Sequence, residues 1–164
     1  MKASASKHIA VWLIALCAIS GLVVAAALAP INGETGPDFF RFLGRFHPLA
    51  LHLPIAFLVL APLCEASRLS PKTAHLARAT TPILFLASIS AFLTVALGLT
   101  LAASEGHGGA LVDKHRWGGV TVASLATIAF ALRFTLGERR SPVGWSVYGG
   151  VLAVASCALV ITAH

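Results

Sequence analysis

The order of apolar and polar residues along the chain predicts a bundle of about five membrane-spanning helices. Residues 9–33, 79–104 and 141–163 contain no Asp, Glu, Lys or Arg. Each of these stretches is long enough for the roughly 20 apolar residues that carry a helix across the hydrocarbon core. Because lipid offers the backbone no hydrogen-bond partners, we expect every such stretch to be helical, which makes the chain an all-α integral membrane protein.

Charged residues and prolines divide the chain into one membrane domain, residues 1–164, with five spans. The spans are expected at roughly 9–29, 48–66, 81–103, 115–136 and 143–162. Pro48 suits the first turn of the second span, where its missing N–H costs nothing. Pro54 and Pro62 lie inside that span and predict bends.

A short amphipathic helix is expected over residues 37–46, before the second span. Phe39, Phe42, Leu43 and Phe46 recur there at helical spacing. Such a helix would lie along the outer membrane interface with its aromatic face in the lipid. A simple belt of interfacial aromatic residues explains the same pattern equally well.

The basic residues predict the orientation of the bundle. With the N-terminus inside, the inner segments hold eight of the 12 Lys and Arg residues, and the outer segments hold Arg41, Arg45, Lys114 and Arg116. Inner segments of bacterial membrane proteins carry the excess of positive charge. We therefore expect a cytoplasmic N-terminus and a periplasmic C-terminus, in the bacterial inner membrane.

Composition supports a membrane protein and excludes other classes. The chain is 57% hydrophobic and 11% charged, whereas soluble domains carry about 25% charged residues. The net charge of +6 is spread over helix ends, which argues against nucleic-acid binding. Cys17, Cys64 and Cys157 each stand alone in an apolar run, so neither covalent haem attachment nor a disulfide framework is expected.

Small residues recur every four positions in the last three spans. The stripes are Ser90, Thr94, Gly98 and Ala102; Gly119, Ala123, Thr127 and Ala131; and Gly149, Ala153 and Cys157. Small stripes let helix backbones approach closely in lipid, so we expect them to pack against neighbouring helices. Glu65 and Arg133 lie near the inner ends of their spans, and we expect them to extend separately to the interface rather than pair.

Histidines gather at the predicted outer face. Five of the seven lie there, namely His47, His52, His107, His115 and His164. His52 is the strongest candidate for a functional role, because it lies inside the second span between apolar neighbours, and an ionisable residue at membrane depth is often functional. Neutral imidazole is also the commonest metal ligand in proteins.

Two imidazoles from facing helices would suit a non-covalent b-type haem held between them. We expect His52 and His115 to be the metal ligands, with His47 and His107 as supporting or further ligands. Arg41, Arg45 and Arg116 lie at the same face, and these cations would hold the haem propionates. Hydrogen-bonded structural histidines are the alternative interpretation of the same pattern.

Two short motifs resemble a known family. His47-Pro48-Leu49-Ala50-Leu51-His52-Leu53-Pro54 is a His-Pro-x-x-x-His-x-Pro helix start, and His115-Arg116-Trp117 begins a later helix. Together they resemble a family of small bacterial membrane domains of unknown function, over roughly residues 39–136. Members are often fused to c-type cytochrome domains, and the resemblance therefore implies an electron-transfer setting, with His47, His52 and His115 as its motif histidines.

Three functional hypotheses follow. The first is a membrane electron-transfer subunit with b-type haem near the outer face, exchanging electrons with a periplasmic c-type cytochrome and the quinone pool or a larger complex. The second is a cofactor-free subunit that anchors a complex. The third is a copper or zinc site built from the outer histidines. No catalytic constellation is recognisable in the sequence, so an independent enzyme is not expected.

Overall fold

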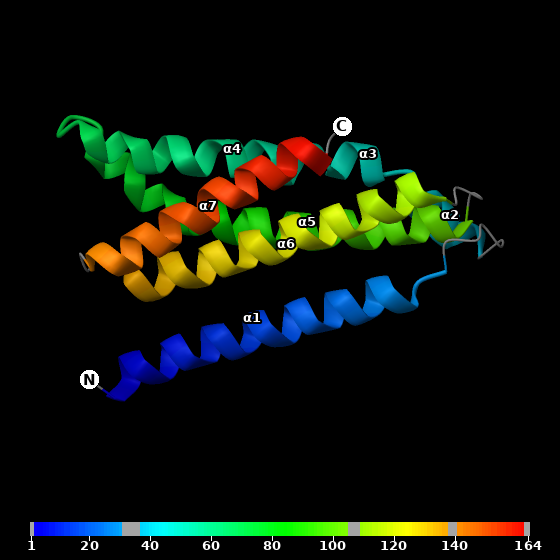
Figure 1. Cartoon of the computed structure of the whole chain (residues 1–164), viewed down its shortest axis with the longest axis horizontal. Coiled ribbons are helices and arrows are strands. Elements are labelled where there is room, and N and C mark those ends of the chain that lie inside the picture. Colours follow the sequence, from blue (N-terminus) through cyan, green and yellow to red (C-terminus); the bar gives the residue numbers. More distant parts are fainter. Residues whose placement is uncertain (1, 31–36, 105–108, 138–140, 163–164) are drawn as a thin grey trace.

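The computed structural model describes residues 2–30, 37–104, 109–137 and 141–162. Over these ranges the chain is helical and contains no strand. Five helical segments are long and apolar enough to cross a membrane, and they run side by side along the long axis of the molecule (Figure 1). The prediction of an all-α bundle with five candidate spans is therefore confirmed.

Seven α-helices and two short 3-10 helices make up the described part of the chain. They are α1 Lys2–Leu28, α2 Asp38–Gly44, α3 His47–Ala50, α4 His52–Ala66, η1 Ser67–Leu69, η2 Ala74–Ala79, α5 Thr80–Ser104, α6 Ala110–Leu136 and α7 Pro142–Thr162. The long helices alternate in direction (Figure 1). We call the end of the bundle that contains His47, His52 and His115 the histidine end, and the end that contains η1 and η2 the loop end.

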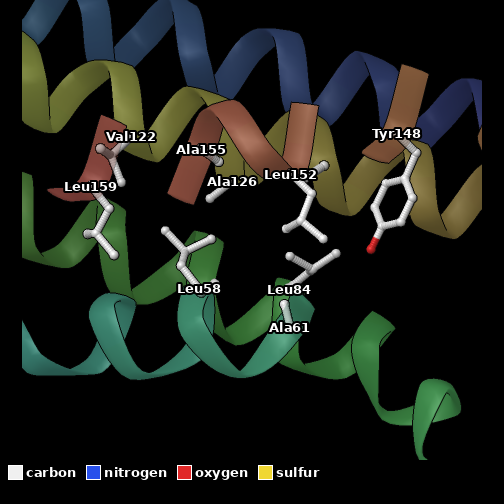
Figure 2. Close-up of a cluster of buried hydrophobic side chains, with 11 residues drawn as sticks. Leu58, Ala61, Leu84, Val122, Ala126, Tyr148, Leu152, Ala155 and Leu159 are labelled. Atoms are coloured by element: carbon white, nitrogen blue, oxygen red, sulfur yellow. The ribbon is translucent and has the colours of Figure 1, made fainter. Parts of the chain in front are cut away.

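Helices α4, α5, α6 and α7 form the main core, and α1 lies at its edge against α6 (Figure 1). Leu58, Leu84 and Leu152 are buried where α4, α5 and α7 meet. Figure 2 shows these leucines pointing toward one another, with Ala126 of α6 and Ala155 of α7 beside them. The alanines leave room for the leucines, so the helices approach closely here.

The second predicted span contains two helices in direct succession. It divides into α3 and α4, and Leu51 separates the two. Pro54 consequently falls in the first turn of α4, where a proline costs little. Pro62 remains inside α4 and cannot donate to the carbonyl of Leu58. The hydroxyl of Ser156 on α7 donates to that carbonyl instead, at 3.4 Å.

Two of the three small-residue stripes pack inside the bundle as predicted. On α5 and α6 they are mostly buried, and beside them the hydroxyls of Ser88 and Thr127 share a hydrogen bond of 2.7 Å. The prediction was wrong for α7, where Gly149, Ala153 and Cys157 are exposed. Helix α7 instead turns a different face to the core, which consists of Tyr148, Leu152, Ala155 and Leu159.

The expectation that Glu65 and Arg133 would remain separate was also wrong. Arg133 Nε donates to Glu65 Oε1 at 2.9 Å, and the Arg133 side chain is only 2% exposed. Arg68 and Tyr148 also donate to the Glu65 carboxylate, at 2.7 and 3.3 Å. Burial makes separate charges costly, so these side chains join α4, α6 and α7 at the loop end.

Candidate functional site

His47 begins α3 and lies against α5. Its Nδ1 is 2.8 Å from the carbonyl oxygen of Thr94. A carbonyl can only accept, so Nδ1 carries the proton and Nε2 keeps a free lone pair. Gly98 lies one turn further along α5, and a Cβ there would come within 2.9 Å of Cε1 of His47. The imidazole therefore occupies the space that the missing side chain leaves.

His115 lies near the start of α6 and faces the end of α7. Its Nδ1 is 3.1 Å from the carbonyl oxygen of Thr162, so this nitrogen too carries a proton and donates to the backbone. Gly118 allows this contact, because a Cβ there would come within 2.7 Å of Thr162 Oγ1. The His115 side chain is exposed on its other side.

These two histidines meet at the histidine end. Their ring centroids are 6.0 Å apart, and the ring planes are nearly perpendicular at 86°. Neither Nε2 has a hydrogen-bond partner among the described residues. A backbone carbonyl on the second ring nitrogen is what orients a metal-ligating histidine and fixes its tautomer. Both rings are thus held through Nδ1, and their Nε2 atoms have no partner among the described residues.

His52 does not join this pair in the structure. Its Nδ1 donates to the carbonyl of Pro48 on the preceding turn, at 2.9 Å, and its side chain is exposed. The neighbour of His115 is therefore His47 rather than the expected His52. His107 lies outside the described residues, as do His164 and Glu105. The role of each as a ligand stays a prediction.

The arginines expected to bind propionates differ in their surroundings. Arg116 donates to the carbonyls of Ala26 and Ala29 at 2.8 and 3.4 Å, and it pairs with Asp113. This side chain therefore ties the end of α1 to α6. Arg41 lies 3.8 Å from Asp38, and its buried Nε has no hydrogen-bond partner among the described residues. Arg45 lies on the exposed surface just before His47.

A small cavity lies beside the histidine pair. Its volume is about 40 Å³, and both Thr94 and Thr162, whose carbonyls hold the two rings, contribute to its wall. A cavity of this size holds a water molecule or two rather than a large group. Within the described ranges, no three His, Cys, Asp or Glu side chains are grouped as a metal site. Any group larger than an ion must extend toward the exposed side of His115.

Sequence reasoning identified the histidines but not the residues that position them. Thr94 and Thr162 contact the histidines through their backbone carbonyls. Every residue type has such a carbonyl, so the sequence does not reveal these contacts. Gly98 belonged to a predicted packing stripe, yet its neighbour is an imidazole and not a helix backbone. Gly118 directly follows the His-Arg-Trp motif. Its position next to that motif is the one feature of the sequence that could have indicated its role beside His115.

Comparisons with known proteins identify the family but no individual relative. Neither the comparison with curated proteins nor the comparison with solved structures gives a match. The family model described as "Predicted membrane protein (DUF2231)" matches residues 45–163. That range includes His47, His52, His115 and helices α3 to α7, and it leaves out α1. The chain therefore belongs to the DUF2231 family of predicted membrane proteins.

Proposed function

We propose that this protein is a membrane electron-transfer subunit with a b-type haem bound by His47 and His115. The single observation that carries the proposal is the meeting of two imidazoles, each with Nδ1 on a backbone carbonyl and Nε2 free. The histidines come from α3 and α6, which are far apart in sequence. Such convergence supports a shared ligand between the helices.

The number and type of donors favour haem iron over zinc. Two neutral imidazoles suffice for a haem iron, because the macrocycle supplies the remaining ligands. A zinc site takes three or four protein ligands. Bound iron would supply one-electron chemistry at the histidine end. The protein would contribute fixed ring orientation through Thr94 and Thr162, and a largely apolar environment that sets the redox potential.

The location of the pair suggests how electrons would enter and leave. The proposal places the histidine end at the periplasmic face, as the distribution of basic residues predicts. A periplasmic c-type cytochrome would then reach the centre from the exposed side of His115. The histidine pair lies at one end of the bundle, so electron transfer across the whole membrane would need a further subunit.

The test is a reduced-minus-oxidised absorption spectrum with metal analysis on protein purified from haem-replete cells. The proposal expects a b-type spectrum and about one iron per chain. His47→Ala and His115→Ala should each abolish the spectrum. His75→Ala is the matched control, because His75 is an exposed histidine of η2 at the loop end, and it should leave the spectrum unchanged.

Other results would replace this proposal. Copper or zinc that is lost in the same two variants would identify a metal site without haem. Protein without metal or spectrum would support the cofactor-free anchoring subunit. His52→Ala distinguishes between the two histidines. Loss of the spectrum in that variant and not in His47→Ala would identify His52 of α4, rather than His47 of α3, as the haem ligand.

A further inference from the structure

The segment between α4 and α5 carries positive charge without a compensating acid. It covers residues 67–79, which we call the basic loop, and comprises η1, η2 and the turn between them at the loop end of the bundle (Figure 1). The basic loop contains no Asp or Glu, and its Lys and Arg residues are Arg68, Lys72 and Arg78. At the histidine end, by contrast, Arg41 and Arg116 each have an aspartate neighbour. The two ends of the bundle therefore differ in how their cations are neutralised.

Lys72 and Arg78 are the cations of the basic loop whose charge is not offset by a neighbour. Both residues are exposed, and neither has an ion-pair or hydrogen-bond partner among the residues that the structure describes. Arg68 differs from them, because its Nε donates to the Glu65 carboxylate at 2.7 Å. Two like charges on one short segment create a positive local potential that attracts an anion.

Hydrogen bonds within the basic loop and to the bundle hold its backbone in place. The hydroxyl of Thr73 donates to the carbonyl of Ser67 at 2.9 Å, which connects the turn to η1. The carbonyl of Ala77 in η2 accepts from Arg133 of α6 at 3.3 Å. Because the backbone that carries the two exposed cations is already ordered, a ligand that meets them costs little further conformational entropy.

The basic loop lies at the surface of the membrane. The candidate spans on its two sides end at Leu69 and begin at Ala74, so only a short turn separates them. Leu69 is 90% exposed and Leu76 is 46% exposed. Exposed leucines beside cations are typical of segments that lie in the membrane interface, with apolar side chains among the acyl chains and cations at the headgroups. A ligand for this surface must therefore combine a negative charge with an apolar part.

We propose that the basic loop binds an anionic phospholipid such as phosphatidylglycerol. The phosphodiester accepts hydrogen bonds from Lys72 and Arg78, and the acyl chains lie against Leu69 and Leu76. Free phosphate lacks the apolar part. Phosphatidylcholine has the apolar part but no net charge, so it leaves the two cations without a counter-charge. The lipid site does not depend on the proposed haem, because the histidine pair lies at the opposite end of the bundle.

Photo-crosslinking of the full chain in phosphatidylcholine nanodiscs tests the site. Two probes are compared at trace amounts, phosphatidylglycerol and phosphatidylcholine, each with a diazirine near the start of one acyl chain. Peptide mass spectrometry measures the labelled fraction of residues 67–79. In the wild-type chain the phosphatidylglycerol probe should label this segment at least roughly fivefold more than the phosphatidylcholine probe, which is about the effect of one cation near a headgroup.

A double substitution identifies the cations that cause this preference. Lys72→Gln with Arg78→Gln should reduce labelling by the phosphatidylglycerol probe to the level of the phosphatidylcholine probe. Both residues are exposed, so neither substitution should affect the fold. The control is Lys7→Gln with Lys114→Gln, which removes two exposed lysines outside the basic loop and leaves the same net charge. This control should be labelled like the wild-type chain.

Three results would overturn the lipid site. Equal labelling by the two probes would show ordinary contact with the bilayer. Equal labelling of the two double variants would show that total charge, and not the basic loop, attracts the anionic lipid. A basic loop that neither probe labels would lie away from the lipid, which would leave its cations for an acidic protein partner.

Discussion

Arg133 and Glu65 form a buried ion pair between α6 and α4, with Nε of the arginine 2.9 Å from Oε1 of the carboxylate. Arg133 also donates to the carbonyls of Gly137 and Ala77. Its guanidinium lies over the ring of Trp145 at 5.4 Å. One side chain thus connects the end of α6 with α4, η2 and α7, at the end of the bundle opposite the histidines.

Removing one partner of this pair is expected to destabilise the fold strongly. Glu65→Gln leaves a buried guanidinium without its counter-charge, which costs roughly 3–5 kcal/mol in the free energy of unfolding. Denaturant titration in detergent measures the change. Arg78→Gln is the control, since Arg78 is an exposed arginine of η2, and it should change stability by less than about 0.5 kcal/mol. Equal effects of the two substitutions would contradict a structural role for the pair.

Gly98 is expected to be essential for the position of His47. In Gly98→Ala the new methyl group would lie 2.9 Å from Cε1 of the imidazole, so the ring must move or the helices must separate. We expect loss of at least half of the bound haem, or of whichever metal is bound, at unchanged helix content. Metal analysis and circular dichroism measure the two quantities.

The control for that substitution is Gly149→Ala. A Cβ at Gly149 meets nothing within 4 Å, and alanine favours a helix over glycine by about 1 kcal/mol. This variant should keep the full metal content and unfold no more easily than wild type. If Gly98→Ala binds metal as well as Gly149→Ala does, the close approach of His47 to α5 is not needed for the site.

Arg116 is expected to hold the outer end of α1 rather than a cofactor. It donates to the carbonyl of Ala26 in the last turn of α1 and to that of Ala29 just after the helix, and carbonyls at a helix end lack partners within the helix. In Arg116→Gln, amide hydrogen exchange of the last turn of α1 should become faster, while exchange in α4 stays unchanged. Lys114→Gln changes a neighbouring exposed cation and serves as the control. Loss of haem with unchanged exchange in Arg116→Gln would instead support a propionate contact.

The sequence was sufficient to predict the helices and the end at which the histidines gather. Apolar length is a local property of the chain, and each long uncharged stretch, such as 79–104, does contain a helix. Alternating spans then place His47, His52 and His115 at one end, and His8 and His75 at the other. These conclusions need only the order of the spans.

The partners of individual side chains could not be predicted in the same way. Whether His47 or His52 turns inward depends on how closely α3 approaches Gly98 of α5. Hydropathy gives the depth of a residue in the membrane but not the direction in which it faces around the bundle. For the same reason the depth of Glu65 and Arg133 was clear from sequence, and their pairing was not.

The most direct test of the central claim is chemical rescue of a ligand-deleted variant. His115→Gly removes one imidazole at an exposed position, so free imidazole in the buffer can reach the vacated place. The account predicts that this variant lacks the b-type spectrum and regains it on addition of imidazole, whereas His47→Gly, in a more buried place, regains less. A His115→Gly protein that keeps the wild-type spectrum without imidazole would contradict a haem shared by His47 and His115.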